Sequence, residues 1–261
     1  MAAMADDYPP GFVDPRHSHR RAQLIYATTG VMSVSTRDRG FVVPPQRALW
    51  LPGGVEHEVL CRGQVSLRTL YVDRKASLRL PTIPRVIEIS PLLRELILEA
   101  VRMPVEYDLN GRDGRVMSLI MDEIESMAIA PLSVPMPQER QLVRICHSIL
   151  ENPAEHLTLA SWAKAAGMSR RTFTRLFRRE TEMSFAEWRQ HVRLLEALSR
   201  LAVGHAVTTV AFDVGYSSSS AFTAMFRRAF GTTPTDYVDR ALAFPRQKPG
   251  GSGGIDNIKC T

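Results

Sequence analysis

Five arginines lie between Arg170 and Arg179, in a segment with the hydrophobic spacing of an amphipathic helix. Phe173, Leu176 and Phe177 follow the i, i+3, i+4 pattern of a buried stripe. The side chains left to project outward are Arg170, Arg171, Thr174, Arg175 and Arg178. Guanidinium groups neutralise phosphates and can contact guanine O6 and N7 together. These residues predict a helix that enters a DNA groove; the alternative is a helical scaffold with a solvated basic face.

Two histidines near the N-terminus carry a different candidate chemistry. His17 and His19 are two residues apart in a segment that has the pattern of an edge strand. Alternate residues of a strand face the same side, so both imidazoles can point together. A neutral imidazole is a common ligand of Zn²⁺ and similar ions.

The arginine-rich helix belongs to a repeated segment. Residues 163–179, AKAAGMSRRTFTRLFRR, align with residues 211–228, AFDVGYSSSSAFTAMFRR, after one insertion in the second copy. Each copy predicts a helix, a tight turn and a second helix. Gly167 and Gly215 stand at the turns, where the chain needs positive φ.

A long helix is expected between the two copies. Ser184 and Glu187 form a capping-box pattern, and the apolar spacing continues to about Ala202. Nineteen residues give a rod of roughly 28 Å. This is close to one turn of DNA, about 34 Å, so the two second helices could enter successive major grooves.

The front half has the pattern of β structure. Short apolar runs alternate with turn residues over residues 11–72, and Val65–Val72 alternates as a half-buried strand does. Helices are expected from Ser90, followed by Pro91 at the first position, and near Arg115–Ala128. We therefore expect a flexible N-terminus at 1–10, a sensory domain at 11–130, a proline-rich linker at 131–137, a DNA-binding domain at 138–243 and a disordered tail at 244–261.

The charge separates the two halves. Residues 1–137 carry no net charge, and the whole formal excess of +6 lies in residues 138–261. A basic half beside a neutral half indicates a polyanionic partner. Three scattered cysteines, no signal-peptide pattern and no run of eighteen apolar residues indicate a cytoplasmic protein without a membrane span.

Residues 138–240 resemble the double helix-turn-helix domain of the AraC/XylS family of bacterial transcription regulators. The resemblance covers both repeats, including LTLASWAKAAGMSRRTFTRLFRRETEMSFAEW and VAFDVGYSSSSAFTAMFRRAFGTTPTDYV. It implies that the second helix of each repeat enters the major groove. The implied contacts are Arg170, Arg171, Thr174, Arg175 and Arg178 in the first repeat, and Ser218, Ser219, Ser220, Thr223, Arg227 and Arg228 in the second. Ala224 stands where the first repeat has Arg175. The second helices of the two repeats therefore do not present the same side chains to the bases.

The front half resembles the cupin barrel. Gly11, His17, His19, Gln23 and Gly30 have the spacing of its first motif, and Pro52, Gly54 and His57 that of its second. The resemblance implies a site for a metal or effector formed by His17, His19, Gln23 and His57. Gln23 replaces the usual glutamate, so a divalent, zinc-like ion would lose one balancing charge. The alternative is that these side chains hydrogen-bond within the barrel or line an effector pocket.

The expected fold is therefore α+β and multidomain: a cupin-like β-barrel with trailing helices, then an all-α double helix-turn-helix domain. The expected function is a sequence-specific transcription regulator that responds to a small effector or metal. The alternatives are a metal-dependent cupin enzyme, such as a dioxygenase or isomerase, with an accessory helical domain, and a non-specific architectural DNA binder. No catalytic acid–base pair is evident, which favours a protein that is not an enzyme.

The expected partners are double-stranded promoter DNA, a second copy of the chain, and RNA polymerase if the protein is an activator. The helices near Ser90–Met103 and Arg115–Ala128 are more apolar than the outside of a barrel requires, and similar helices form dimers in the family. Polar substitutions at Leu93 and Ile97 are expected to weaken a dimer only if these side chains are not core within one subunit.

Overall fold

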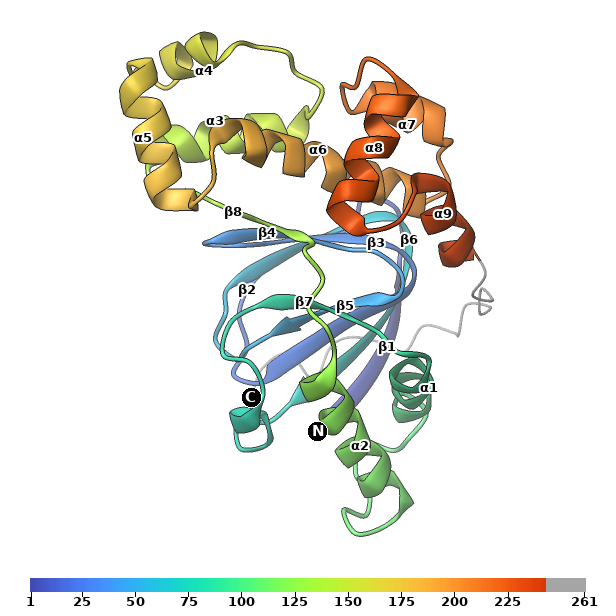
Figure 1. Cartoon of the computed structure of the whole chain (residues 1–261). Coiled ribbons are helices and arrows are strands. Elements are labelled where there is room, and N and C mark those ends of the chain that lie inside the picture. Colours follow the sequence, from blue (N-terminus) through green and yellow to red (C-terminus); the bar gives the residue numbers. More distant parts are fainter. Residues whose placement is uncertain (243–261) are drawn as a thin grey trace. The chain divides into compact units, whose positions relative to one another are not determined.

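The computed structural model describes residues 1–242, and the expected tail at 244–261 lies outside the described residues. The chain divides into two compact units. The first comprises Met1–Thr36 and Phe41–Leu132; among the described residues, the second comprises Arg37–Gly40 and residues 133–242. The expected order, a sheet-rich unit followed by a helical one, is confirmed (Figure 1). None of the described helices is long and apolar enough to cross a membrane.

An antiparallel sheet forms the first unit. The long strand β6 pairs with β1, β2 and β3, and β5 pairs with β3 and β7. Residues such as Cys61, Val65, Leu70 and Val72 of β6 are buried in the core, and most of the strand's other residues are half-buried. The strands are β1 (Ala2–Tyr8), β2 (Val13–His17), β3 (Ala22–Thr36), β4 (Arg39–Val43), β5 (Arg47–Leu51), β6 (His57–Val72) and β7 (Arg85–Glu88).

Two features of this sheet differ from the sequence-based expectation. Residues 1–10 are not a flexible arm, because β1 pairs with β6 from Ala2 opposite Tyr71 to Tyr8 opposite Val65. The segment AAMADDY has few of the residues that favour strands, so only its long-range partner fixes its conformation. The runs around Leu24 and Val31 are parts of one strand, β3, whose pairing with β6 shifts register between them.

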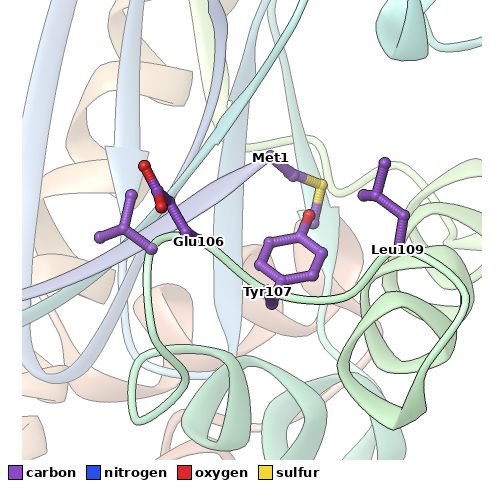
Figure 2. Close-up of a pocket in the computed structure, with 5 residues that line it drawn as sticks. Met1, Glu106, Tyr107 and Leu109 are labelled. Carbon is purple, nitrogen blue, oxygen red and sulfur yellow. The ribbon is translucent and has the colours of Figure 1, made fainter.

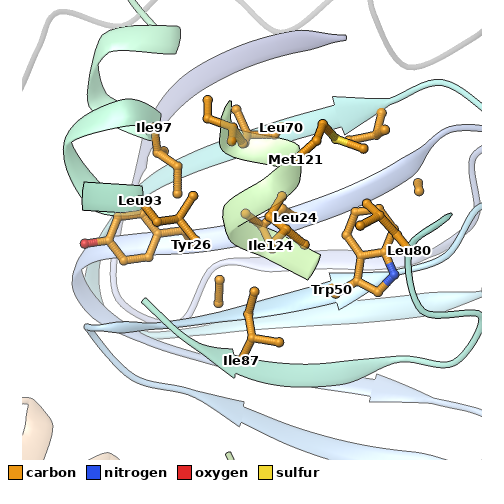
Figure 3. Packing of buried hydrophobic residues seen from close by; sticks show 14 of the residues in the cluster. Leu24, Tyr26, Trp50, Leu70, Leu80, Ile87, Leu93, Ile97, Met121 and Ile124 are labelled. Atoms are coloured by element: carbon orange, nitrogen blue, oxygen red, sulfur yellow. The ribbon is translucent and has the colours of Figure 1, made fainter. Parts of the chain in front are cut away.

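Two helices cover the core of this unit. After the 3₁₀ helix η1 (Ala76–Arg79) and β7 come α1 (Pro91–Ala100) and α2 (Arg112–Ser126). The expected start of α1 is confirmed, because the Ser90 side chain accepts a hydrogen bond from the Leu93 amide and Pro91 follows. Figure 3 shows Leu93 and Ile97 packed with residues of the strands and of α2. Both side chains are 0% exposed. They belong to the core of one subunit and are unsuitable for testing a dimer.

The second unit consists of helices and one short strand. Two helix-turn-helix pairs, α4–α5 and α7–α8, are joined by α6 (Figure 1). The capping box of Ser184 and Glu187 is present at the start of α6, as expected. The elements are β8 (Ser133–Pro135), α3 (Arg140–Glu151), α4 (Leu159–Ala165), α5 (Arg170–Thr181), α6 (Phe185–Ala202), α7 (Val207–Asp213), α8 (Ser219–Phe230) and α9 (Pro234–Leu242).

The turns of the two pairs need glycine. Gly167 has φ +67° and Gly215 has φ +86°, which confirms the expected left-handed conformation. At Gly215 a Cβ atom would also be crowded, since it would lie 3.1 Å from Arg193 Cζ and 3.2 Å from Ala154 Cα. The turn of the second pair is therefore packed tightly against α6 and the loop before α4.

Aromatic side chains form the cores of both pairs. Phe177 on α5 lies 5.2 Å from Phe185 and 5.8 Å from Trp188, measured between ring centroids. The Trp188 indole also donates a 2.7 Å hydrogen bond to the Pro135 carbonyl, which ties β8 to α6. In the second pair Phe226 contacts Phe222, with centroids 5.6 Å apart. These contacts fix how each second helix projects from its pair.

Candidate functional site

The outer face of α5 presents the expected polar side chains to solvent. The side chains of Arg170, Arg171, Thr174, Arg175 and Arg178 are all exposed. Among the described residues, Arg170, Arg171 and Arg175 have no ion-pair partner. Thr174 donates its hydroxyl to the Arg170 carbonyl within the helix. The face is therefore positively charged without internal neutralisation, which suits a polyanion.

The corresponding face of α8 has different chemistry. Ser218 caps the helix by accepting a 3.2 Å hydrogen bond from the Ala221 amide. Ser220 is exposed, Ser219 and Thr223 are half-buried, and the exposed Ala224 aligns with Arg175. The guanidinium groups of this helix, Arg227 and Arg228, lie in its last turn and are exposed. Ser219 and Ser220 therefore occupy the positions of Arg170 and Arg171 on α5, and alanine occupies that of Arg175.

Two arginines that the sequence did not single out hold the second unit together. Arg193 on α6 donates from Nε to the Pro153 carbonyl at 2.9 Å and from a terminal nitrogen to the Gly215 carbonyl at 3.4 Å. Arg189, one turn earlier, donates to the carbonyls of Glu155 and Leu157. Burial lowers the pKa of both groups. The sequence shows that the two arginines have i, i+4 spacing and so share one face of α6. It does not identify the carbonyls that they bind, because these are distant in sequence.

In the first unit the structure brings His17, His19 and His57 together. His17 ends β2 directly opposite His57 on β6. The ring centroids of His17 and His57 are 4.5 Å apart, and that of His19 lies 5.5 Å from His17 and 5.1 Å from His57. One ring nitrogen from each of the three lies within 4.8 Å of the others. Strand pairing therefore creates the cluster.

A glycine turn holds His19 in place. The Gly54 amide donates a 2.8 Å hydrogen bond to the His19 carbonyl. At Gly53 a Cβ atom would lie 2.3 Å from the Arg20 carbonyl oxygen, so only glycine allows this approach. On its other side, the His19 ring meets Tyr71 edge-on, with centroids 5.4 Å apart.

The imidazoles share one pattern of hydrogen bonding. Nδ1 of His17, His19 and His57 contacts the backbone carbonyl of Pro15, Arg21 and Val55, at 2.7, 3.2 and 2.9 Å respectively. Burial lowers the pKa of His57 to about 4 and also lowers that of His19. His17 Nδ1 also lies 3.8 Å from a carboxylate oxygen of Asp14, a neighbour that sequence reasoning missed.

Gln23, the fourth expected residue, is also at this site. It pairs with Tyr71 in the sheet, and its amide nitrogen donates to the Thr69 hydroxyl at 3.0 Å and to the Tyr71 hydroxyl at 3.4 Å. Its Oε1 atom is buried and accepts no hydrogen bond among the described residues. Nearby Cys61 is buried, and burial raises the pKa of its thiol to about 11, so it is protonated at neutral pH.

A small cavity adjoins the histidines. Its volume is about 40 Å³. Its polar lining includes Asp14, His17, Gln23, His57 and Tyr71, and the remaining lining is mostly apolar. Pockets for drug-sized ligands are typically about 300–1,000 Å³. This space fits an ion with one or two small ligands.

A second hollow lies at the surface between the N-terminus and the chain between α1 and α2 (Figure 2). It measures about 490 Å³ but is wide open to solvent. In Figure 2, Glu106 lies to one side of Met1 and Tyr107, and Leu109 lies to the other. It lacks the converging polar groups of the histidine site, so the latter is the better candidate for a specific ligand.

Comparison with protein families assigns a description to each unit. Residues 3–123 match the family described as AraC-like ligand binding domain, and residues 162–240 match a helix-turn-helix domain family. The first match covers the strands and helices that surround the histidine site, and the second covers α5, α6 and α8.

Individual relatives of the chain are transcription regulators. The HTH-type transcriptional regulator NimR of Escherichia coli (strain K12) is 34% identical over 226 residues, covering 87% of this chain and 82% of NimR. RipA of Corynebacterium glutamicum, also an HTH-type transcriptional regulator, is 36% identical over 104 residues, which are 40% of this chain and 31% of RipA. A solved DNA-binding transcriptional dual regulator from Escherichia coli K-12 shares 33% identity, covering 40% of this chain and 95% of that one, with a TM-score of 0.37. NimR and RipA are both transcription regulators, and nothing about either of them favours an enzyme.

Proposed function

Because the chain belongs to the AraC family of DNA-binding transcription regulators, we propose that α5 and α8 enter two successive major grooves of an asymmetric operator. In this proposal α5 supplies most of the sequence discrimination. The residues that contact DNA are Arg170, Arg171, Thr174, Arg175 and Arg178 from α5, and Ser218, Ser219, Ser220, Thr223, Arg227 and Arg228 from α8.

The observation that carries this proposal is the exposed, unneutralised arginine face of α5. Arginine can donate two hydrogen bonds to guanine O6 and N7, a pairing that distinguishes G·C from the other base pairs. Arg171 and Arg175 are one helical turn apart, so both can reach base edges along one groove. Serine hydroxyls both donate and accept, and therefore discriminate less between bases.

The spacing of the two helices supports the same proposal. The connecting helix α6 has 18 residues, which corresponds to about 27 Å. Successive major grooves on one face of DNA are about 34 Å apart. Arg193 links α6 to the turn before α8 through partly buried hydrogen bonds, which help to hold this spacing.

Competition binding tests whether recognition is sequence-specific. An operator fragment is selected from a random library, and labelled operator is then competed with unlabelled operator or random DNA. We expect random DNA to compete about 1,000-fold less well or worse. Equal competition by both DNAs would instead identify an architectural binder held by its arginines alone.

Arg227 and Arg228 are expected to contact phosphates, since they lie at the far end of α8 from its exposed serines. Each phosphate contact adds about 0.9 to the slope of log affinity against log salt. The double variant Arg227→Ala/Arg228→Ala should therefore flatten the slope by about 2 while leaving base preference unchanged. Titrations between 50 and 200 mM salt measure the slope. An unchanged slope, or an altered base preference, would contradict this assignment.

The proposal includes a homodimer formed through the outer faces of α1 and α2. Leu92 and Leu119 are 49% and 41% exposed on these helices, and burying them against a second copy would remove apolar surface from water. Sedimentation should show a dimer at micromolar concentration for the wild type and a monomer for Leu92→Arg/Leu119→Arg. Ile83→Arg, also at an exposed apolar residue but outside both helices, should remain dimeric. A monomeric wild type would rule the dimer out.

The proposal also covers the effector, a protein partner and the cellular compartment. The ligand-binding unit senses a small effector or metal ion, an activating regulator would contact RNA polymerase, and the protein acts in the cytoplasm. The free thiols of Cys61 and Cys146 support a reducing compartment.

A further inference from the structure

The histidine cluster has the geometry of an open metal site. Three ring nitrogens, one each from His17, His19 and His57, lie within 4.8 Å of one another. Bonds of about 2.05 Å in a tetrahedral zinc site place ligand nitrogens roughly 3.3 Å apart. The nitrogens therefore need to approach one another by at most about 1.5 Å. Two of them belong to the paired ends of β2 and β6, and a glycine turn fixes the third.

The hydrogen bonds leave the same atom available on each ring. A carbonyl oxygen can only accept, so the contacts to Pro15, Arg21 and Val55 place the proton on Nδ1 of each histidine. In a neutral imidazole the other nitrogen, Nε2, then carries a lone pair. Histidines that bind metals are held in this way, with the second nitrogen bonded to a carbonyl or carboxylate.

Two buried atoms of the site lack the partner that a cation would provide. Nε2 of His19 and Oε1 of Gln23 are buried and accept no hydrogen bond among the described residues. With the His19 proton on Nδ1 both atoms are acceptors, and only the other tautomer, with its proton on Nε2, could donate to Gln23 Oε1. A buried acceptor without a hydrogen-bond partner carries a cost in folding free energy. A cation bound by both would remove this cost.

We propose that Nε2 of His17, His19 and His57 binds a divalent transition-metal ion of the zinc class, with Gln23 Oε1 as a fourth donor, and that this ion is the ligand sensed by the domain. The sensing part rests on the proposed regulatory function. Nitrogen-rich donor sets favour Zn²⁺, Co²⁺, Ni²⁺ or Cu²⁺, whereas Ca²⁺ and Mg²⁺ prefer oxygen ligands. The nearby Asp14 carboxylate offsets part of the charge, and the small cavity leaves room for an exchangeable ligand.

Metal binding is measured first on the full chain without a tag or DNA. Chelator-treated protein is titrated with Zn²⁺ by calorimetry, and with Co²⁺ by its visible absorption, whose intensity distinguishes a four-coordinate protein site from the hydrated ion. We expect one ion per chain. His17→Ala and His19→Ala should each weaken binding at least about 100-fold, because losing even an outer-shell partner can cost 10–100-fold. His147→Ala, at an exposed histidine of α3, should bind as the wild type does.

Two further variants sharpen this test. Gln23→Glu should tighten Zn²⁺ binding, since it adds a negative charge at the fourth donor. His57 is 1% exposed, so His57→Ala is interpreted only if its circular dichroism spectrum matches the wild type. No stoichiometric binding by the wild type, or equal binding by His17→Ala, His19→Ala and His147→Ala, would overturn the site.

Operator affinity is then measured with and without Zn²⁺. A change in the wild type that is absent in His17→Ala supports sensing. The same operator affinity with and without the ion, in a protein shown to bind it, would overturn sensing while the metal site stands. A wild type that binds Zn²⁺ but shows no preference for any DNA would instead overturn the proposed regulatory function.

Discussion

Replacing Phe177 by alanine should lower the free energy of unfolding of the helical unit by about 3–5 kcal/mol. The Phe177 side chain is 0% exposed and packs between α5 and α6 against Phe185 and Trp188. Its removal leaves a cavity that surrounding aromatic rings cannot fill without moving. Because a typical domain is stable by only about 5–15 kcal/mol, a large part of the population would unfold on mild heating.

Urea unfolding followed by circular dichroism at 222 nm measures this effect, since most helices lie in the second unit. Arg175→Ala is the matched control on the same helix. Its side chain is exposed, so its unfolding free energy should stay within about 0.5 kcal/mol of the wild type. A loss below 1 kcal/mol for Phe177→Ala would show that α5 is not anchored by this aromatic core.

Arg171→Ala and Arg175→Ala should each weaken operator binding by about 1–3 kcal/mol and relax the preference at particular base pairs. The double variant should lose about the sum, because contacts to separate base pairs contribute almost additively. The physical reason is that each lost guanidinium leaves a guanine edge without its donors. Neither arginine has an ion-pair partner among the described residues that would confuse the result.

The matched comparison for these variants is Ser219→Ala on α8. Its effect should be smaller, since a hydroxyl supplies one weaker contact. Equilibrium binding to the operator and to operators with single base changes gives both affinity and preference. A uniform loss across all sequences for Arg175→Ala would mean that this side chain touches only phosphate.

Local signals in the sequence predicted the helical unit well. The turn glycines, the Ser184 capping box and the buried Phe173 and Phe177 each follow from residues a few positions apart. Such patterns depend on backbone conformation and helical periodicity, which the chain determines locally. The repeat then doubled the evidence, because the same pattern predicted both pairs.

Features that depend on distant partners were missed or remained open. Strand β1 has a weak strand sequence and forms through its pairing with β6. Arg193 gains its role from carbonyls 22 and 40 positions away. At the candidate metal site the sequence identified the residues that could act as ligands. It could not predict the direction of each ring or the unpartnered Oε1 of Gln23, because these depend on strand register and packing.

The most direct test of the central claim is a base-by-base substitution scan of the selected operator, with equilibrium affinity measured for each single change. If α5 supplies most of the discrimination, substitutions in one half-site should cost about 1–3 kcal/mol at two or more positions. Base substitutions in the half-site contacted by α8, one turn of DNA away, should cost clearly less. In the Arg175→Ala variant, the costs of base substitutions should fall only in the half-site contacted by α5. Two results would contradict the claim that α5 discriminates between bases more than α8 does. One is an equal loss of affinity for substitutions in both half-sites, and the other is an Arg175→Ala scan with the same profile as the wild type.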